Sequence, residues 1–273
     1  MSTLLQISDP HFGTEQPPVV AALLALAAEL QPEVVVVSGD ITQRARAAQF
    51  ATAAAFLKQL PTPQVLAIPG NHDIPLFNLW ARVVAPYANF QSAFGANLEP
   101  HFTGDDLFVA CVNTTRPQRH KDGEVSATQI ERVCAQLRSA GRSQLRVVVV
   151  HQPVHVIRRE DLANLLHGHE AAVRQWSQAG ADIVMGGHIH LPYVRGLHEH
   201  YGDLARRIWA VQAGTAVSHR VRHEAPNSVN VVRHRARQAT CEVERWDYAA
   251  ASREFRCVEM QTMELDRRQA TPT

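Results

Sequence analysis

The sequence predicts an α/β fold built around a parallel sheet, and three observations support this prediction. Short strand-like runs alternate with helical segments over the first seventy residues. These runs are continuous and rich in β-branched residues, which is typical of strands covered on both faces. They also end in polar residues that favour turns. Open α/β sheets place their sites at the carboxyl ends of parallel strands, so we expect these polar ends to converge.

Size and composition indicate an ordinary globular protein. The 273 residues fit one large α/β domain or two small ones, and no composition break indicates a second. We expect one domain over residues 1–265 and a disordered tail over 266–273. The formal charge of +1 and the 45% of hydrophobic residues do not point to nucleic acid or a charged membrane.

Cysteine usage and the absence of targeting signals favour the cytoplasm. The four cysteines show no CxxC spacing, which favours free thiols in a reducing compartment, although Cys241 and Cys257 are open to pairing across late strands. No signal peptide is recognisable, and no run reaches the roughly 18 apolar residues of a membrane span. We therefore expect no membrane partner, and a homo-oligomer stays open.

The first seventy residues alternate strand and helix. Pro17 and Pro18 open a helix at positions where a missing N–H costs little, and Leu23 and Ala27 belong to its apolar stripe. The rhythm predicts parallel strands joined by right-handed crossovers. The elements expected in order are strand 4–8, a helix over 17–30, strand 34–38, a helix through residues 50–60 and strand 65–68.

Two segments beyond residue 70 are candidate caps. Residues 74–100 are helical and rich in aromatic side chains, and they form either a surface hairpin or a wall beside the site. Residues 154–169 form a second candidate lid. They contain His155, His167 and His169, for which solvated or locally hydrogen-bonded roles are favoured over metal ligation.

The remaining elements include a capped helix and many strands. Ser126 to Gln129 form a capping-box pattern that starts a helix. The helical period disappears after His190, and the strands that follow are expected to be antiparallel and to form a second sheet. The expected strands are 107–112, 147–150, 183–185, 193–197, 208–213, 228–232, 240–246 and 255–258.

Five strand ends carry Asp, Asn and His. Any one of these residues alone fits an ordinary turn or a hydrogen-bonded polar group. Seven of the residues at these ends, four His, two Asp and one Asn, exceed the ligand set of one tetrahedral ion and suit a pair of ions about 3.5–4 Å apart. Mixed imidazole and carboxylate ligands favour manganese, iron or zinc. The five ends are Asp9-Pro10-His11, Gly39-Asp40, Gly70-Asn71-His72-Asp73, His151-Gln152-Pro153 and Gly187-His188-Ile189-His190.

In this order, the five motifs resemble the pattern of the calcineurin-like metallophosphoesterase family over residues 3 to about 215. The resemblance implies a four-layer α/β/β/α sandwich, in which two packed mixed β-sheets are flanked by helices. It also implies roles for single residues. Asp9, His11 and His190 would hold one ion, Asn71, His151 and His188 the other, and Asp40 would bridge them, while His72 would protonate or stabilise the leaving oxygen and Asp73 would hold the His72 ring.

Arg44 lies four residues after Asp40, where phosphoprotein phosphatases similar to this chain carry a phosphate-binding Arg. The match is partial, because Gln43 precedes Arg44 and Asp73 stands in place of a Glu. The departure favours the bacterial phosphodiesterase branch over a protein phosphatase, and Arg44 is either a substrate contact or a surface residue. The leading hypothesis is hydrolysis of a small phosphodiester by attack of a metal-bound hydroxide, with a 3′,5′-cyclic nucleotide as first candidate.

Two alternatives stay open. A nuclease would use a basic groove, but the near-neutral charge and 6% of aromatic residues weigh against it. A catalytically inactive phosphoesterase scaffold, kept as an interaction module, would be expected to lack a ligand, and none is missing. The residues proposed for the nuclease groove are Arg220, Arg222, His223, Arg233, His234, Arg235 and Arg237.

Overall fold

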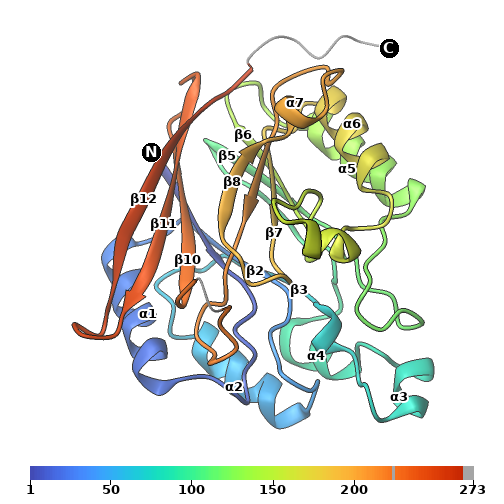
Figure 1. The fold of residues 1–273 in the computed structure, drawn as a ribbon, viewed down its shortest axis with the longest axis vertical. Coiled ribbons are helices and arrows are strands. Elements are labelled where there is room, and N and C mark those ends of the chain that lie inside the picture. Colours follow the sequence, from blue (N-terminus) through green and yellow to red (C-terminus); the bar gives the residue numbers. More distant parts are fainter. Residues whose placement is uncertain (223–224, 267–273) are drawn as a thin grey trace.

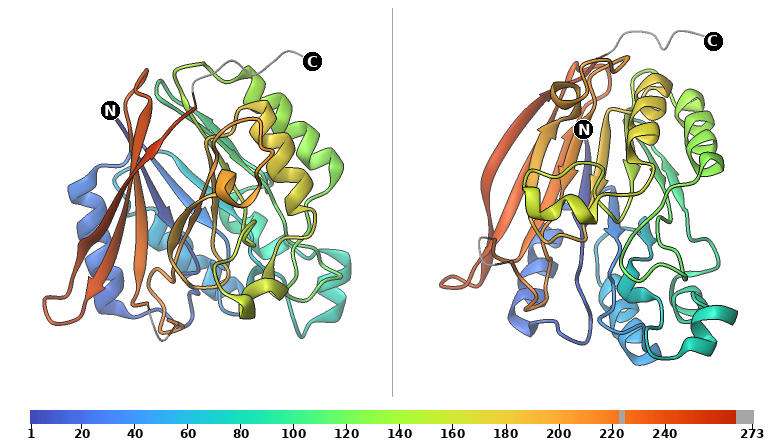
Figure 2. Two further views of the ribbon diagram at one scale, coloured as in Figure 1. Left: turned by 45° about the horizontal axis from the view of Figure 1, so that its top comes forward. Right: turned by 45° about the vertical axis from the view of Figure 1, so that its right-hand side comes forward.

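Two six-stranded sheets pack face to face, with helices on both outer faces (Figures 1 and 2). The computed structural model describes residues 1–222 and 225–266. The predicted four-layer α/β/β/α sandwich of mixed sheets is therefore confirmed. Of the tail predicted to be disordered, Asp266 is described and residues 267–273 lie outside the described part of the chain.

The first sheet has the strand order β12-β11-β10-β1-β2-β3. The parallel pairing of β1 with β2 and of β2 with β3 confirms the predicted alternation of strand and helix in the first seventy residues. The other three strands run antiparallel to their neighbours. The strands are β1 (Ser2–Ile7), β2 (Val34–Ser38), β3 (Val65–Ile68), β10 (Ser228–His234), β11 (Thr240–Ala249) and β12 (Glu254–Glu264).

The second sheet has the order β4-β5-β6-β7-β9-β8. Its four central strands are parallel, and its two edge strands are antiparallel to their neighbours. The strands are β4 (His101–Thr103), β5 (Leu107–Cys111), β6 (Leu145–Val149), β7 (Ile183–Gly186), β8 (Tyr193–Gly196) and β9 (Trp209–Gln212).

The expectation that the strands after residue 193 form a sheet of their own is wrong. β8 and β9 extend the second sheet, whereas β10 pairs with β1 and brings β11 and β12 into the first. The β10–β1 pairing runs from Ser2 opposite His234 to Gln6 opposite Asn230. The local pattern of a short apolar run marks a strand but does not specify its partner, because pairing depends on distant parts of the chain.

Side chains on each strand alternate between two cores. Leu4, Val34 and Val36 are buried between the sheets, together with apolar side chains of β5, β6 and β7. Leu5 and Val35 point to the other face and pack under helices α1 (Pro17–Leu30) and α2 (Ala47–Leu57). Because both faces are covered, the strands are continuous apolar runs.

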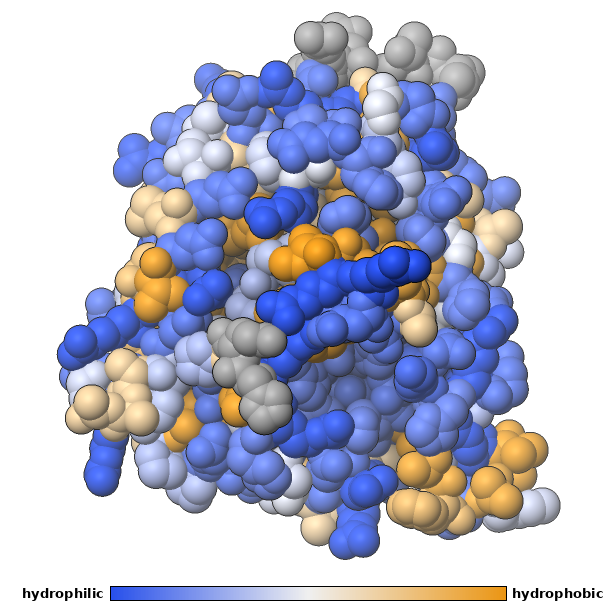
Figure 3. Space-filling view, viewed as in Figure 1, coloured by the Kyte–Doolittle hydropathy of each residue, from blue (hydrophilic) through white to orange (hydrophobic). Residues whose placement is uncertain are grey.

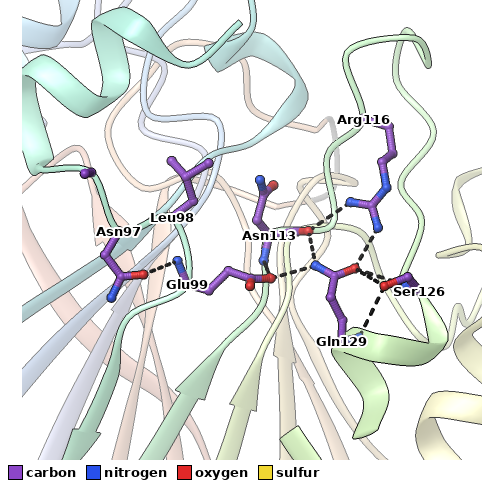
Figure 4. A pocket seen from close by; sticks show the side chains of 8 residues that line it. Asn97, Leu98, Glu99, Asn113, Arg116, Ser126 and Gln129 are labelled. Atoms are coloured by element: carbon purple, nitrogen blue, oxygen red, sulfur yellow. Dashed lines mark hydrogen bonds between the residues drawn. The ribbon is translucent and has the colours of Figure 1, made fainter. Parts of the chain in front are cut away.

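Two further helices, α5 (Ala127–Ser139) and α6 (His169–Ala179), cover the second sheet around the fully buried Trp176 (Figure 2). The predicted capping box starts α5. Ser126 Oγ accepts a hydrogen bond from Gln129 N (3.2 Å), and Gln129 Oε1 accepts one from Ser126 N (3.0 Å; Figure 4). Short helices η1 (Asn71–Asp73), η2 (Arg159–Asn164) and α7 (Leu197–His200) lie in the connections.

Residues 74–100 form helices α3 (Leu79–Val84) and α4 (Ala88–Phe94). Phe90 of α4 is buried against Phe50 of α2, with 6.1 Å between the ring centroids. In contrast, Phe77, Trp80 and Val83 at α3 are 78–80% exposed and form an apolar area at the lower right of Figure 3. The segment thus combines an anchored helix with an exposed one.

Candidate metal centre

The five polar strand ends meet at one end of the two sheets. His11 Nε2 lies 3.2 Å from His190 Nε2, and His190 Nε2 lies 3.3 Å from Asp9 Oδ1. On the other side, His151 Nε2 lies 3.2 Å from Asn71 Oδ1. Strands from both sheets therefore contribute to one cluster.

Asp40 lies between two groups of candidate ligands. Its Oδ2 is 3.8 Å from His11 Nε2, and its Oδ1 is 3.3 Å from His151 Nε2. Among the described residues, three groups have candidate ligand atoms within 4.8 Å of one another: Asp9, His11 and His190; His11, Asp40 and His72; and Asp40, His151 and His188. Asp40 therefore lies between the two ligand sets that the family resemblance implies, and its role as a bridge stays a prediction.

Five of the predicted ligands have left-handed backbone conformations. The φ angles are 49° at Asp9, 44° at His11, 50° at Asp40, 72° at His188 and 56° at His190. Positive φ is uncommon outside glycine, although Asp and His tolerate it better than most residues. At each strand end the chain leaves the extended conformation and turns sharply, so that side chains one or two positions apart reach the same cluster.

Two glycines make room for these turns. A Cβ atom on Gly39, where φ is 95°, would lie 2.3 Å from His151 Nδ1. A Cβ atom on Gly70 would lie 2.1 Å from Asp40 N. Both distances are far below van der Waals contact, so any other residue would displace a neighbouring ligand.

Backbone carbonyls orient the imidazole rings. His151 Nδ1 donates to Ser38 O (2.9 Å), and His190 Nδ1 donates to Arg220 O (2.6 Å). Because Nδ1 carries the donated proton, Nε2 is the nitrogen that faces the cluster. This arrangement is the usual one for a metal-binding histidine. Burial opposes a charged ring, but Asp40 raises the pKa of His151 to about 9 and Asp9 raises the pKa of His190, so each ring would lose its Nε2 proton on binding a cation.

The electrostatics of the cluster suit cations. Burial lowers the pKa of His11 and of His188 to about 3, so both rings are neutral lone-pair donors at pH 7. Burial opposes the charge of Asp9, but His190 and His151 hold the pKa of this carboxyl at about 2. Asp9 Oδ1 and His188 Nδ1 are buried and have no hydrogen-bond partner among the described residues. Charged carboxylates, the neutral imidazoles of His11 and His188, and orphaned polar atoms together fit a metal pair.

His72 lies beside the ligand cluster and faces the cavity. Its Nδ1 donates to Gln43 O (3.0 Å), and its Nε2 lies 3.1 Å from Arg220 Nη1. Its ring is perpendicular to that of His11, with 4.8 Å between the centroids. The backbone of His72 also donates to Asp40 Oδ1 (2.8 Å).

The prediction that Asp73 holds the His72 ring is wrong. The Asp73 carboxylate accepts hydrogen bonds from Ile41 N (2.9 Å), Thr42 N (2.8 Å), Thr42 Oγ1 (2.8 Å) and Gly70 N (2.9 Å). Burial, together with the nearby Asp40 charge, raises the pKa of Asp73 to about 6. The 3-10 turn sends this side chain towards the loop after β2, away from the cavity, so that Asp73 anchors the loop that carries Asp40.

A cavity of about 480 Å³ opens beside the cluster. Besides predicted site residues, its lining includes Lys121, Asp161 and Asn164, none of which belongs to a predicted site motif. Arg220 and Arg222 also line it, although the sequence suggested them only for a nuclease groove. No local pattern marks these residues, because they come from loops that only the fold brings together.

The candidate substrate contact Arg44 lies elsewhere. Its guanidinium carbon is 5.4 Å from the centre of the Phe77 ring, and it is not among the described residues that line the cavity. Of the two candidate caps, residues 154–169 contribute Asp161 and Asn164 to the described lining, whereas residues 74–100 contribute none.

The other histidines of residues 154–169 make local contacts. The His155 ring lies 4.9 Å from that of His200, and His169 Nδ1 donates to Leu166 O (2.8 Å). His167 N donates to Gly123 O (3.0 Å). These contacts agree with the preference for local roles over metal ligation.

A second cavity, of about 450 Å³, lies near the start of α5 (Figure 4). Gln129 occupies its centre, where it accepts from Arg116 Nη2 (2.6 Å) and donates to Glu99 Oε1 (2.6 Å) and Asn113 O (2.8 Å). These polar groups satisfy one another, in contrast to the orphaned atoms of the metal cluster.

Comparisons with known proteins concern the family and the fold of the chain. The sequence pattern of the calcineurin-like phosphoesterase family matches residues 2–192. No curated protein matches the chain. Within residues 1–222 and 225–266, every helix is too short or too polar to span a bilayer.

Several solved structures share the fold. A dimetal phosphatase from Danio rerio has a TM-score of 0.67 and 13% identity, over 97% of this chain and 99% of that one. Purple acid phosphatase PPD1 from yellow lupin (Lupinus luteus) has a TM-score of 0.72 and 11% identity, over 96% of this chain. This chain spans about half (53%) of the lupin protein. Vps29 from Chaetomium thermophilum has a TM-score of 0.51 and 10% identity, over 97% and 98% of the two chains.

The position of Asp40 predicts a specific pattern of metal loss. Asp40→Ala should leave less than about one ion per chain, because both groups lose a shared ligand, whereas His11→Ala should lose mainly one of two ions. Elemental analysis of protein purified with Mn²⁺ and Zn²⁺ measures this. Asp105→Asn, at an exposed residue in the turn before β5, is the matched control and should keep the wild-type content. One ion or none in the wild type would contradict the two-ion assignment.

The contacts of Asp73 predict a stability effect. Asp73→Asn replaces an oxygen acceptor with an NH₂ donor, which must face backbone N–H groups, so we expect a loss of about 1–3 kcal/mol in the free energy of unfolding. Metal affinity should fall with it, because the loop carrying Asp40 loses its anchor. Denaturant unfolding of metal-free protein and a metal titration test these effects. Unchanged stability would show that the loop is held by other contacts.

Proposed function

The chain belongs to the calcineurin-like phosphoesterase family of metal-dependent phosphoesterases, and from this premise we propose that it is a phosphodiesterase with a dinuclear metal centre. The proposed substrate is a small phosphodiester, and a 3′,5′-cyclic nucleotide is the first candidate. The observation that supports this proposal most directly is the position of Asp40, whose two carboxylate oxygens lie 3.8 Å from His11 Nε2 and 3.3 Å from His151 Nε2.

In this proposal, Asp9, His11 and His190 hold one ion, Asn71, His151 and His188 hold the other, and Asp40 bridges the two. Mixed nitrogen and oxygen ligands suit manganese, iron or zinc. The ions would supply a nucleophile at neutral pH and withdraw charge from the phosphate oxygens. The protein contributes a rigid, buried set of ligands, whose carboxylates stay charged and whose rings are oriented by backbone carbonyls.

His72 is proposed as the proton donor to the leaving oxygen. Gln43 O fixes one proton on Nδ1, so the proton given to the leaving oxygen would be the second proton of an imidazolium, carried on Nε2, the atom that lies 3.1 Å from Arg220 Nη1 in the neutral ring. Asn71 and His72 are adjacent and both line the cavity, but they have different neighbours. Asn71 Oδ1 lies 3.2 Å from His151 Nε2, whereas the His72 ring contacts Gln43 and Arg220, which supports a ligand role for Asn71 and an acid role for His72.

The size and charge of the cavity favour a small diester. A volume of about 480 Å³ is within the ~300–1,000 Å³ range of small-molecule sites. Arg222 is neutralised by ion pairs with Asp161 (3.0 Å) and Glu160, which leaves less positive charge for a dianionic monoester. A diester carries a single negative charge and needs less positive charge from the protein.

The basic residues proposed for a nuclease groove do not form one surface. Arg220 and Arg222 line the cavity beyond the carboxyl end of β1, whereas Arg233 pairs with Thr3 at the beginning of that strand. His223 lies outside the described residues. The inactive-scaffold alternative is disfavoured because no predicted ligand is missing and the candidate ligand atoms cluster.

Cysteine chemistry supports the cytoplasm as the proposed location. The four cysteines, all within the described residues, form no disulfide, and Cys111, Cys134 and Cys241 are buried. Free thiols are typical of a reducing compartment. Cys241 and Cys257 are not bonded to each other: Cys241 lies opposite Met263 and Cys257 opposite Trp246.

Substrate choice is tested with protein reconstituted with Mn²⁺. We expect kcat/KM for bis-p-nitrophenyl phosphate to exceed that for p-nitrophenyl phosphate, because the site offers limited charge to a dianion. Cyclic nucleotides, glycerophosphodiesters and single-stranded DNA complete the panel. A preference for the monoester by roughly tenfold or more would reverse the assignment, and faster cleavage of single-stranded DNA than of small diesters would favour the nuclease.

The role of His72 predicts a dependence on the leaving group. His72→Ala should keep both metals and lose about 10²–10⁴-fold in rate on an alkyl or ribose leaving group. The loss on p-nitrophenolate should be much smaller, since this group departs without a proton. Metal content and a leaving-group series measure the difference. Equal losses across the series would mean that His72 binds phosphate or supports the metal ligands instead.

A further inference from the structure

We propose that Arg220 is the residue that binds the phosphate group of the substrate, through the open edge of its guanidinium. The inference rests on the proposed function, since it assigns a substrate contact to the same cavity. Arg220 lies in the loop after β9 and is half-buried in the cavity wall. Its position beside His72 was not expected from the sequence, which suggested Arg44 for this role.

The Arg220 guanidinium is held on one side only. Its Nη1 donates to Gln43 Oε1 (3.1 Å) and lies 3.1 Å from His72 Nε2. Nε and Nη2 have no hydrogen-bond partner among the described residues, and neither is a buried unsatisfied atom. Nε and Nη2 form one edge of the planar group, which presents two parallel N–H donors. This geometry matches two oxygens of a phosphate.

The charge of Arg220 also lacks a partner. Within residues 1–222 and 225–266, no carboxylate lies within ion-pair distance of its guanidinium, whereas Arg222, two positions later, pairs with Asp161 and Glu160. Both arginines line the same cavity. An unpaired guanidinium beside a centre built for cations is stabilised by an anion that contacts both. A phosphate ester is such an anion.

The loop around Arg220 fixes its position relative to the metal centre. Arg220 O accepts from His190 Nδ1 (2.6 Å) and from Thr215 Oγ1 (3.1 Å). The same residue therefore orients a candidate metal ligand through its backbone and faces the cavity with its side chain. A phosphate oxygen contacting an ion held by His190 would lie close to the donors of Arg220.

Gln43 connects Arg220 to the proposed proton donor. Its side chain accepts from Arg220, and its backbone carbonyl accepts from His72 Nδ1. Arg44, the next residue, turns outward and stacks on Phe77. Gln43 thus contacts both groups that face the cavity. Arg220 occupies the cavity wall that Arg44 was expected to reach as a substrate contact.

Binding of inorganic phosphate to the Mn²⁺-loaded protein, measured by isothermal titration calorimetry, tests the inference. Arg220→Gln should weaken phosphate binding about 10- to 100-fold, the effect expected from losing charge-assisted hydrogen bonds, with unchanged metal content. Arg220→Lys keeps the charge but loses the two parallel N–H donors, so its affinity for phosphate should lie between that of Arg220→Gln and that of the wild type. Arg142→Gln, at an exposed residue before β6, is the matched control, and its phosphate affinity should stay within about twofold of the wild-type value.

The outcomes separate this inference from the proposed function. Wild-type phosphate affinity in metal-replete Arg220→Gln would overturn the inference, even if the protein hydrolyses diesters. Loss of phosphate binding together with loss of metal would also overturn it, because Arg220 would then act on the metal ligands. If Arg220→Gln does not fold, Arg220→Lys serves as the test. Wild-type phosphate affinity in Arg220→Lys would contradict the two-donor contact. Arg220-dependent phosphate binding in a protein that hydrolyses no ester would support the inference and refute the proposed function.

Discussion

The candidate metal centre depends on how the chain turns at the ends of its central strands. Asp9, His11, Asp40, His188 and His190 all have positive φ. Conformations of this kind cost on the order of 1–3 kcal/mol each for residues that do not favour them, and they persist where surrounding contacts fix them. Here the loops after β1 and β2 bond to each other, through Asp9 N to Gly39 O (3.1 Å) and His11 N to Asp40 O (3.0 Å). The ligands are therefore positioned by backbone contacts that do not involve an ion.

Asp73 connects the loop after β3 to the loop after β2 through hydrogen bonds to the backbone. Four donors from two loops converge on its carboxylate, which is 1% exposed. A buried carboxylate is costly unless it is hydrogen-bonded, so these contacts stabilise one arrangement of both loops strongly over others. Gly70 permits the close approach, because its missing side chain would otherwise occupy the position of Asp40 N. The geometry of the bridging residue Asp40 is thus set by a neighbour that does not face the cavity.

The sequence predicted the parts of this site that lie next to strands, and missed the parts that depend on distant contacts. A residue such as Asp40 follows an apolar run directly, so its place at a sheet edge follows from local pattern alone. The role of Asp73 depends instead on the direction of one side chain in a 3-10 turn, which adjacency to His72 does not reveal. The pairing of β10 with β1 joins residues more than 220 positions apart, beyond the reach of periodicity. Arg220 was recognised as basic, but its place beside His72 follows only from the fold.

In the proposed function, different groups of the cavity contact different parts of the substrate, and this determines which of them can distinguish substrates. The phosphate group would be recognised by features common to all phosphoesters, namely the two ions and the donors of Arg220. His72, as the proposed proton donor, would respond to the basicity of the leaving oxygen. The remaining described lining comes from the loops around Lys121 and residues 220–222 and from η2, where Asp161 is held by Arg222 and Asn164 lies alongside. If the strand ends bind metal as proposed, selectivity among substrates would arise in this loop-built wall, where polar side chains face the cavity.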